Sequence, residues 1–310
     1  MKTGGSRTSK VERSRDAKSA GERAAVRGTL LIVLSAACFG AIAILTALAT
    51  RAGGDLRGVL FWRYALAVPT LVAVSGGVRA LRAGPRDAAR VALLGGGGQA
   101  LLAFATLSAL AYIPASALGF LFFTFPAWVA LFAAVTGAER MTVSRAAALG
   151  LALGGIALMV GAPGAADLHP VGVALALGGA VLYALYIPLL DRLRARAGAV
   201  GSTAWVCVGA AIALGVAATV AGAPSALLLP AGAWLPVLGL AVLSTALGFV
   251  LFLRGLEILG PVRAAIIATV EPFWTAALGA IVLGEPLTGA TIAGGGLIAL
   301  AVLLLQRRPA

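Results

Sequence analysis

The 310-residue chain is 61% hydrophobic and only 11% charged, and its mean hydropathy is +1.02. A water-soluble domain has about half apolar residues, so this chain has too few polar side chains to cover itself, which excludes a soluble globular protein. The formal net charge of +13 does not indicate a nucleic-acid partner, because the basic residues are scattered over short breaks between apolar blocks instead of forming one stripe.

The chain begins with a basic tail, residues 1–28, that is predicted to be disordered because it contains little that could pack. Apolar blocks of about 18 to 23 residues follow, which is the helix length that crosses roughly 30 Å of hydrocarbon. They lack the alternation of transmembrane barrel strands. Ten transmembrane helices are predicted, at residues 29–49, 59–76, 89–111, 113–133, 143–161, 170–190, 201–222, 234–254, 261–283 and 288–306.

The shortest break lies between the third and fourth predicted helices. Only Tyr112-Ile113-Pro114 divides a long apolar stretch there. Proline disfavours the helical conformation in the residue before it, so we expect a tight turn at this place. The turn brings the number of helices to ten, an even number that puts both termini on one side of the membrane.

The charges predict the orientation of these helices. If the N-terminus is cytoplasmic, twenty-one of the 24 Lys and Arg residues fall on the cytoplasmic side and only Arg51 and Arg57 on the outside, while Arg63 lies within a span. This asymmetry follows the positive-inside rule. The sequence therefore predicts a multi-pass protein of the cytoplasmic cell membrane, in contact with membrane lipid and with both termini in the cytoplasm.

The chain contains an internal repeat at an offset of 146 residues. Pro126-Ala127-Trp128 recurs as Pro272-Phe273-Trp274, and Glu139 recurs as Glu285. Five helices, an odd number, precede the second copy, so it must cross the membrane in the opposite direction. The fold class predicted is an all-α membrane protein of two inverted five-helix repeats. Its units are the tail 1–28, the first repeat 29–163, the second, inverted repeat 164–306 and a cytoplasmic C-terminus 307–310.

Inverted repeats favour a secondary transporter, because two related halves can rock about a central site and expose it to each side in turn. A duplication that only enlarged a membrane scaffold is one alternative, and a passive channel is another. A third is an integral membrane enzyme acting on lipid carriers, which is disfavoured because no acidic pair or His-Glu-x-x-His motif occurs within a span. We therefore predict no enzyme activity and no catalytic residue.

Several short motifs carry a resemblance to a known family. They are Glu271-Pro272, Gly284-Glu285, Leu287-Thr288, Gly294-Gly295-Gly296 and Phe61-Trp62-Arg63-Tyr64. Over residues 29–306 the chain resembles the drug/metabolite transporter superfamily, specifically its EamA-type members with ten helices. The resemblance implies export or exchange of metabolites, such as amino acids or related small solutes, through a central cavity. The first repeat departs from the pattern, because Phe125-Pro126 stands where the second has Glu271-Pro272.

Two ionisable residues lie within predicted spans, where each costs at least about 2.5 to 3.5 kcal/mol. Glu271 lies near the midplane beside Pro272, which would loosen the helix. It is either a carboxylate that binds protons or substrate, or a protonated, hydrogen-bonded group that supports the proline kink. Arg63 lies nearer the outer end of its span. It either extends to the membrane surface or binds an anion, from the substrate or from an ion-pair partner.

Neutral polar and aromatic residues complete the candidate set. Gln99 and its offset partner Thr245 lie deep in spans and either bind substrate or bond to a neighbouring helix. Tyr183 and Tyr186 share a helix face, as Trp274 does with Glu271, and would either contact an organic solute or pack against lipid and core. The glycine run at 95–98 lets helices approach closely and leaves a homodimer open.

The remaining residues predict no metal site and no cofactor. The two cysteines lie singly inside apolar blocks, and the one histidine, His169, lies in a short break. The sequence contains no ATP-binding motif. An ion gradient, exchange or the solute's own gradient is therefore the expected driving force for the small-molecule substrate.

Overall fold

The computed structural model describes residues 5–74, 77, 84–136, 142–161, 168–194, 199–259, 264 and 267–306. All regular elements within these ranges are helices. Among the described residues, six helices are long and apolar enough to cross a membrane, and four shorter apolar helices take the remaining places. The prediction of an all-α protein with ten transmembrane helices is confirmed.

The helices divide between the two repeats in chain order. The first repeat contains α1 (Gly5–Arg51), α2 (Leu56–Val74), α3 (Pro85–Arg90), η2 (Val91–Gly96), α4 (Gly97–Leu107), η3 (Ser108–Ala111), α5 (Ala115–Phe122), α6 (Phe125–Val135) and α7 (Val143–Gly161). The second contains α8 (Pro170–Arg194), α9 (Ala199–Val220), η4 (Pro224–Leu227), α10 (Ala231–Gly239), η5 (Leu240–Leu247), α11 (Gly248–Leu259), α13 (Glu271–Leu283) and α14 (Gly289–Gln306). The segments η2 and η5 are π-helical, and η3 and η4 are short 3-10 turns.

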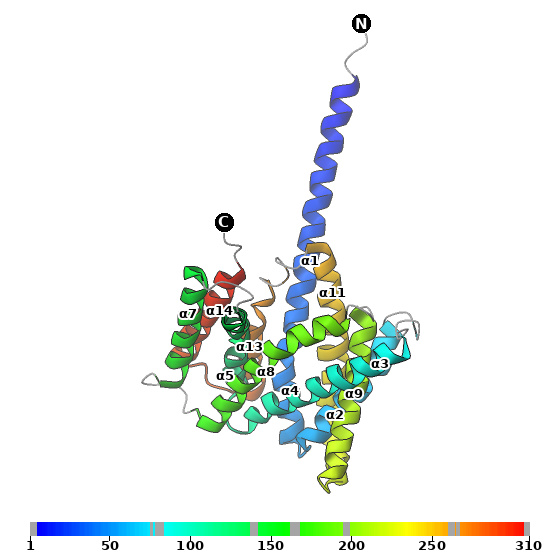
Figure 1. Ribbon diagram of the computed structural model, residues 1–310. Coiled ribbons are helices and arrows are strands. Elements are labelled where there is room, and N and C mark those ends of the chain that lie inside the picture. Colours follow the sequence, from blue (N-terminus) through cyan, green and yellow to red (C-terminus); the bar gives the residue numbers. More distant parts are fainter. Residues whose placement is uncertain are drawn as a thin grey trace.

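Helix α1 is much longer than the predicted span of residues 29–49. It begins at Gly5 and stands away from the bundle at its N-terminal end (Figure 1). The structure therefore differs from the predicted disordered tail of residues 1–28. The physical reason is local: residues 5–28 contain no proline and are rich in Ala, Lys, Arg and Glu, which have high helix propensity.

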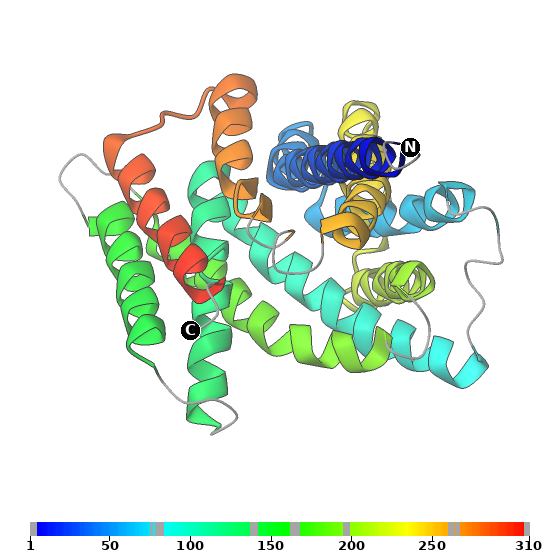
Figure 2. The ribbon, with the colours of Figure 1, turned by 90° about the horizontal axis from the view of Figure 1, so that it is seen from above.

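The two repeats interlock through pairs of equivalent contacts. Helix α1 packs on α11 and α13, and at the repeat offset the corresponding contacts are those of α8 with α4 and α6. Likewise α2 packs on η5 as α9 packs on η2. Helices α7 and α14, the last of each repeat, pack on each other at one side of the molecule (Figures 1 and 2). The packing thus follows the internal symmetry that the sequence predicts.

Two helices are interrupted at equivalent positions. The chain turns at Phe123 and Thr124 between α5 and α6, and residues 269–270 form the turn before α13. The offset of 146 residues relates these two turns. In α6 and α13 a proline occupies the first turn, where its missing N–H needs no partner. The predicted spans at residues 113–133 and 261–283 thus each contain a turn, and Pro272, which was expected to loosen its helix, lies in the first turn of α13. Residues 261–263 and 265–266 of the second span lie outside the described residues.

The third helix of each repeat contains a π-helical segment. At the repeat offset η2 maps onto residues 237–242, which overlap η5. Gln99 lies in the first turn of α4, just after η2, and its offset partner Thr245 lies within η5. Segments of this kind are rare and often mark functional sites. Because these segments recur in both repeats, the side chains of Gln99 and Thr245 are candidates for a functional site.

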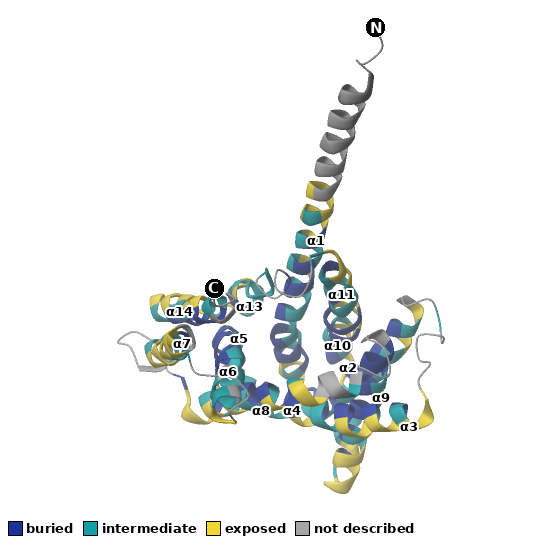
Figure 3. Cartoon of the chain, turned by 45° about the horizontal axis from the view of Figure 1, so that its top comes forward, coloured by how far each residue is buried: buried dark blue, intermediate teal, exposed yellow. Residues whose placement is uncertain are grey.

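Buried residues lie on the helices in the middle of the molecule, and exposed residues lie on the outer sides of the peripheral helices (Figure 3). Buried residues follow α1, α5 and α9, whereas α7 and α14 carry exposed residues along their outer sides (Figure 3). Large apolar side chains on the outer surface are strongly exposed, including Leu93, Leu235 and Ile281 at 76–81%. Such a surface is expected of helices that face lipid.

Candidate functional site

Arg63 points into the protein from α2. Its side chain is only 6% exposed, and its Nε donates a hydrogen bond of 3.0 Å to Oγ1 of Thr245 on η5. Thr245 in turn donates to the carbonyl oxygen of Leu240, five residues earlier, at 2.8 Å. The π-helical turn brings that carbonyl within reach. Arg63 therefore does not extend to the membrane surface.

The next residue of α2, Tyr64, forms a corresponding contact within its own repeat. Its hydroxyl accepts a hydrogen bond of 3.1 Å from Nε2 of Gln99, and the Cζ atom of Arg63 lies 5.1 Å from the Tyr64 ring centroid. Gln99 and Thr245 are offset partners, so equivalent positions of the two repeats hold neighbouring side chains of α2. We call Arg63, Tyr64, Gln99 and Thr245 the α2 cluster.

The charge of Arg63 is not balanced within the described part of the chain. No carboxylate described there lies within 4.0 Å of its guanidinium, and only Nε has a hydrogen-bond acceptor. By contrast Arg57, near the start of the same helix, pairs with Asp55 at 3.0 Å. The hydrogen bond from Arg57 holds the pKa of Asp55 below its ordinary value. Of the two arginines of α2, Arg57 is therefore paired with a carboxylate, whereas Arg63 has only the neutral hydroxyl of Thr245 as a hydrogen-bond partner among the residues that the structure describes.

The two predicted tyrosines of α8 have different partners. Tyr186 is 6% exposed, and its hydroxyl donates to the carbonyl oxygen of Gly95 in η2 at 2.7 Å. Tyr183 stacks on Phe122 with ring centroids 5.4 Å apart and meets Phe125 edge-on at 4.8 Å. Tyr186 thus supports the π-helical segment that precedes Gln99, whereas Tyr183 covers the break between α5 and α6.

Glu271 and Trp274 occupy the first turn of α13. This turn packs closely on α1, because a Cβ atom at Gly40 would lie 3.0 Å from Cβ of Trp274 and 3.1 Å from the carbonyl oxygen of Glu271. Within the described residues, nothing donates a hydrogen bond to the Glu271 carboxylate or forms an ion pair with it. Arg63 bonds Thr245 instead, so the structure does not join Arg63 to Glu271.

The two helix breaks differ in chemistry. In the first repeat, Nε1 of Trp128 donates a 3.2 Å hydrogen bond to the hydroxyl of Thr124 within the turn. The second repeat has Val270 in place of Thr124, and its tryptophan, Trp274, is 37% exposed. The first break is lined by aromatic rings, whereas the second carries the carboxylate of Glu271.

Glu285 makes a contact that sequence reasoning missed. Its Oε1 accepts a hydrogen bond from the N–H of Ala115 at 2.8 Å, and its Oε2 accepts one from the N–H of Ser116 at 3.1 Å. The carboxylate therefore caps the start of α5. A cavity of about 280 Å³ lies beside it and includes Arg51 and Tyr112 in its lining. The Gly284-Glu285 motif was the available signal, but nothing in it points to backbone partners 169 and 170 residues away.

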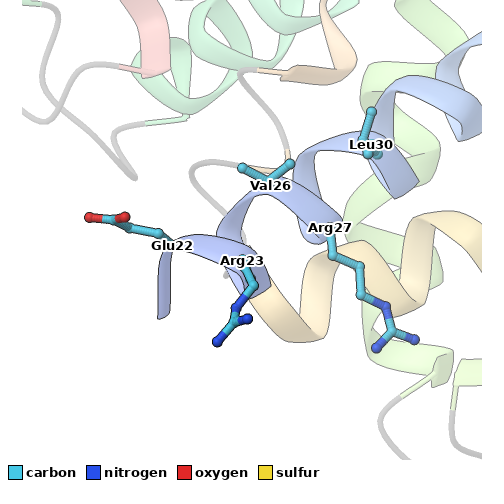
Figure 4. A pocket seen from close by; sticks show the side chains of 5 residues that line it. All are labelled: Glu22, Arg23, Val26, Arg27 and Leu30. Atoms are coloured by element: carbon cyan, nitrogen blue, oxygen red, sulfur yellow. The ribbon is translucent and has the colours of Figure 1, made fainter. Parts of the chain in front are cut away.

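A wider hollow of about 480 Å³ lies at the N-terminal end of α1 and involves none of the predicted site residues. It is lined by Glu22, Arg23, Val26, Arg27 and Leu30, and in Figure 4 Glu22 points to the left while the two arginines point downward from the helix. Within the described ranges, no three His, Cys, Asp or Glu residues come together as metal ligands. The predicted site residues that carry polar groups thus lie away from this hollow, at the α2 cluster, on α8 and in the first turn of α13.

The sequence of each five-helix repeat matches the model of a known protein family. A profile of the EamA-like transporter family matches residues 26–161 and again residues 170–307. The chain belongs to the EamA-like transporter family. The resemblance predicted from the sequence is thereby confirmed, and the protein is a membrane transporter by family.

Two further similarities accompany this EamA-like match. An uncharacterized transporter of Archaeoglobus fulgidus is 39% identical over 93 residues, which are 28% of this chain and 34% of the relative. The match thus spans about a third of that relative's length. A solved crystal structure of a protein superposes with a TM-score of 0.61 at 20% identity, covering 89% of this chain and 95% of the other. That similarity concerns the fold alone.

Proposed function

We propose that this EamA-like protein is a secondary transporter that exports small metabolites, such as amino acids or related solutes, across the cytoplasmic membrane by alternating access. The observation that carries the proposal is the pair of helix breaks at equivalent positions of two interlocked repeats. Secondary transporters with inverted repeats place discontinuous helices at their substrate sites, and one repeat moves against the other. The outward direction rests on the family resemblance.

The polar groups inside the bundle receive separate roles in this proposal. The α2 cluster binds the polar part of the solute, because it joins one helix to equivalent positions of both repeats. A relative movement of the repeats changes the contact between Arg63 and Thr245, which joins them. Glu271 takes up and releases the coupling proton at the start of α13. Tyr183, Tyr186 and Trp274 shape the surroundings of these two sites.

The test is solute uptake by the purified full chain in liposomes. Pooled metabolites, amino acids included, are screened for uptake with and without an imposed pH gradient. The proposal expects flux that saturates with solute concentration and responds to the gradient. Flux that rises linearly and ignores the gradient would indicate a channel, and an absence of flux in tight vesicles would contradict transport of these solutes.

A further inference from the structure

The guanidinium of Arg63 is the starting point of a more specific inference. Its depth in α2 is about 10 Å, counted from Leu56 at 1.5 Å per residue. A guanidinium has five N–H donors, and only the Nε donor has an acceptor among the described residues. A buried cation without a counterion is costly, so a site of this kind favours an anionic ligand.

Beyond the bond to Thr245, one edge of the Arg63 guanidinium has no hydrogen-bond acceptor among the described residues. The hydrogen bond from Nε to Thr245 helps to orient the guanidinium, and the edge formed by Nη1 and Nη2 remains for a ligand. Two parallel N–H groups on this edge match the two oxygens of a carboxylate. Gln99 and Tyr64 add neutral hydrogen-bonding groups beside it. Lysine would keep the charge but lose this planar fork.

We propose that the α2 cluster binds the carboxylate group of the transported solute through Nη1 and Nη2 of Arg63. This inference rests on the proposed transport function and specifies its substrate class as carboxylate-bearing solutes. Thr245 is a positioning residue, because it orients the guanidinium without contacting the solute. The ligand supplies the negative charge that the described surroundings of Arg63 lack.

The test compares each standard amino acid with its α-carboxamide and its decarboxylated amine. Thermal stabilisation of the purified full chain measures binding, and liposome uptake measures transport. We expect the acids to bind and move at least about tenfold better than the amides, which is the usual effect of losing a hydrogen bond to a charged group. Arg63→Gln should remove this preference, and Arg63→Lys should raise KM more than it lowers kcat. Arg57→Gln is the matched control, because Arg57 is a partly exposed arginine on the same helix that is paired with Asp55.

The outcomes separate this inference from the proposed function. Acid-specific stabilisation without flux would support the carboxylate site and contradict transport. Equal flux of acid and amide in the unchanged protein would support transport and overturn the carboxylate site, even if the variants fail to fold. Stabilisation by inorganic phosphate but not by any amino acid would also overturn it, as would a retained acid preference in Arg63→Gln.

The contact of Glu285 with α5 carries a second, independent inference. Glu285 belongs to the second repeat and α5 to the first, so the two hydrogen bonds tie the repeats together. A carboxylate at a helix N-terminus also gains from the helix dipole. Gly284 adopts the left-handed conformation with φ of 68° and turns the chain between α13 and Glu285. A Cβ at Gly279 would lie 2.6 Å from Oε2, so the carboxylate fits closely.

The sequence differs at the positions that the repeat offset relates to this contact. Glu285 corresponds to Glu139, and Ala115 corresponds to Pro261, both of which lie outside the described residues. Proline has no N–H, so an equivalent carboxylate there lacks one of the two backbone donors. We infer that Glu285 acts as a latch: its two hydrogen bonds hold the two repeats together at the end of the transporter near Arg51 and keep that end closed. The charge distribution predicts this end to be external. The latch releases when that end opens.

The latch is tested by the reactivity of a cysteine in the adjacent cavity. Ala47 lines this cavity and is 8% exposed. Ala47→Cys is placed in a chain that also carries Cys38→Ala and Cys207→Ala, and an impermeant maleimide is added to the protein in lipid nanodiscs. We expect Glu285→Ala to raise the labelling rate about thirtyfold, because two hydrogen bonds of roughly 1 kcal/mol each are lost.

A second variant removes one donor and keeps the carboxylate. Ala115→Pro gives α5 the residue found at the equivalent position of the second repeat, and proline is well tolerated at the first residue of a helix. We expect its labelling rate to lie between those of the parent and Glu285→Ala. Glu257→Ala, an exposed glutamate on α11, should leave the rate unchanged. Equal rates in all four proteins would overturn the latch.

Discussion

Replacing Gly209 by alanine is expected to abolish stable folding of this EamA-like transporter. A Cβ atom at Gly209 of α9 would overlap the carbonyl of Ala92 in η2 and lie 2.8 Å from Cα of Ala92. These neighbours are backbone atoms, so no side chain can move aside. Overpacking costs typically about 1 to 3 kcal/mol and sometimes more, and here we expect about 3 kcal/mol or more because whole helices must separate. Thermal unfolding in detergent measures the effect.

The glycine run of η2 and α4 provides a matched pair of variants. A Cβ at Gly96 would lie 2.5 Å from Cα of Gly209, whereas a Cβ at Gly97 would meet no atom within 4 Å. Gly96→Ala should therefore resemble Gly209→Ala, and Gly97→Ala should be neutral or slightly stabilising, by up to about 1 kcal/mol. Similar melting temperatures for all three variants would contradict the close approach of α9 and η2.

Glu271→Gln is expected to abolish gradient-driven flux and to leave exchange of solute partly intact. Glutamine keeps the size and polarity of the side chain but cannot bind and release a proton. Glu271 is the ionisable residue at the break that begins α13, and nothing described forms an ion pair with it. Uptake against a solute gradient, driven by an imposed pH difference, should fall to the level of protein-free vesicles.

The control for this variant is Glu257→Gln, since Glu257 is an exposed glutamate on α11. It should retain uphill uptake. If Glu271→Gln retained uphill uptake at the rate of the parent protein, Glu271 would not be the coupling group. Loss of exchange together with uphill uptake would instead assign Glu271 to solute binding.

The features that sequence reasoning captured are those with local signals. The turn at Tyr112-Ile113-Pro114 is present, since η3 ends at Ala111 and α5 begins at Ala115. A proline and a short break were sufficient to place it. The repeat was visible because Pro126 and Pro272 recur with tryptophan at one offset. Both signals depend on a few neighbouring residues rather than on packing.

The features that sequence reasoning missed depend on tertiary contacts. The turn at Phe123 and Thr124 interrupts an unbroken apolar run, so hydropathy could not mark it. The π-helical segments leave the composition of their helices unchanged. The burial of Arg63 follows from Thr245, which is 182 residues away, and the role of Glu285 follows from amides 169 and 170 residues away. The spacing of residues along the chain does not predict contacts between residues so far apart.

Counterflow through reconstituted vesicles tests alternating access most directly. Vesicles containing the protein are loaded with a high concentration of an unlabelled transported solute and diluted into a trace of the same solute carrying a label. A carrier that exposes one site to each side in turn exchanges solute, so labelled solute should accumulate transiently above its external concentration. A steady rise to equilibrium without this overshoot, at a solute concentration that saturates uptake, would contradict the account.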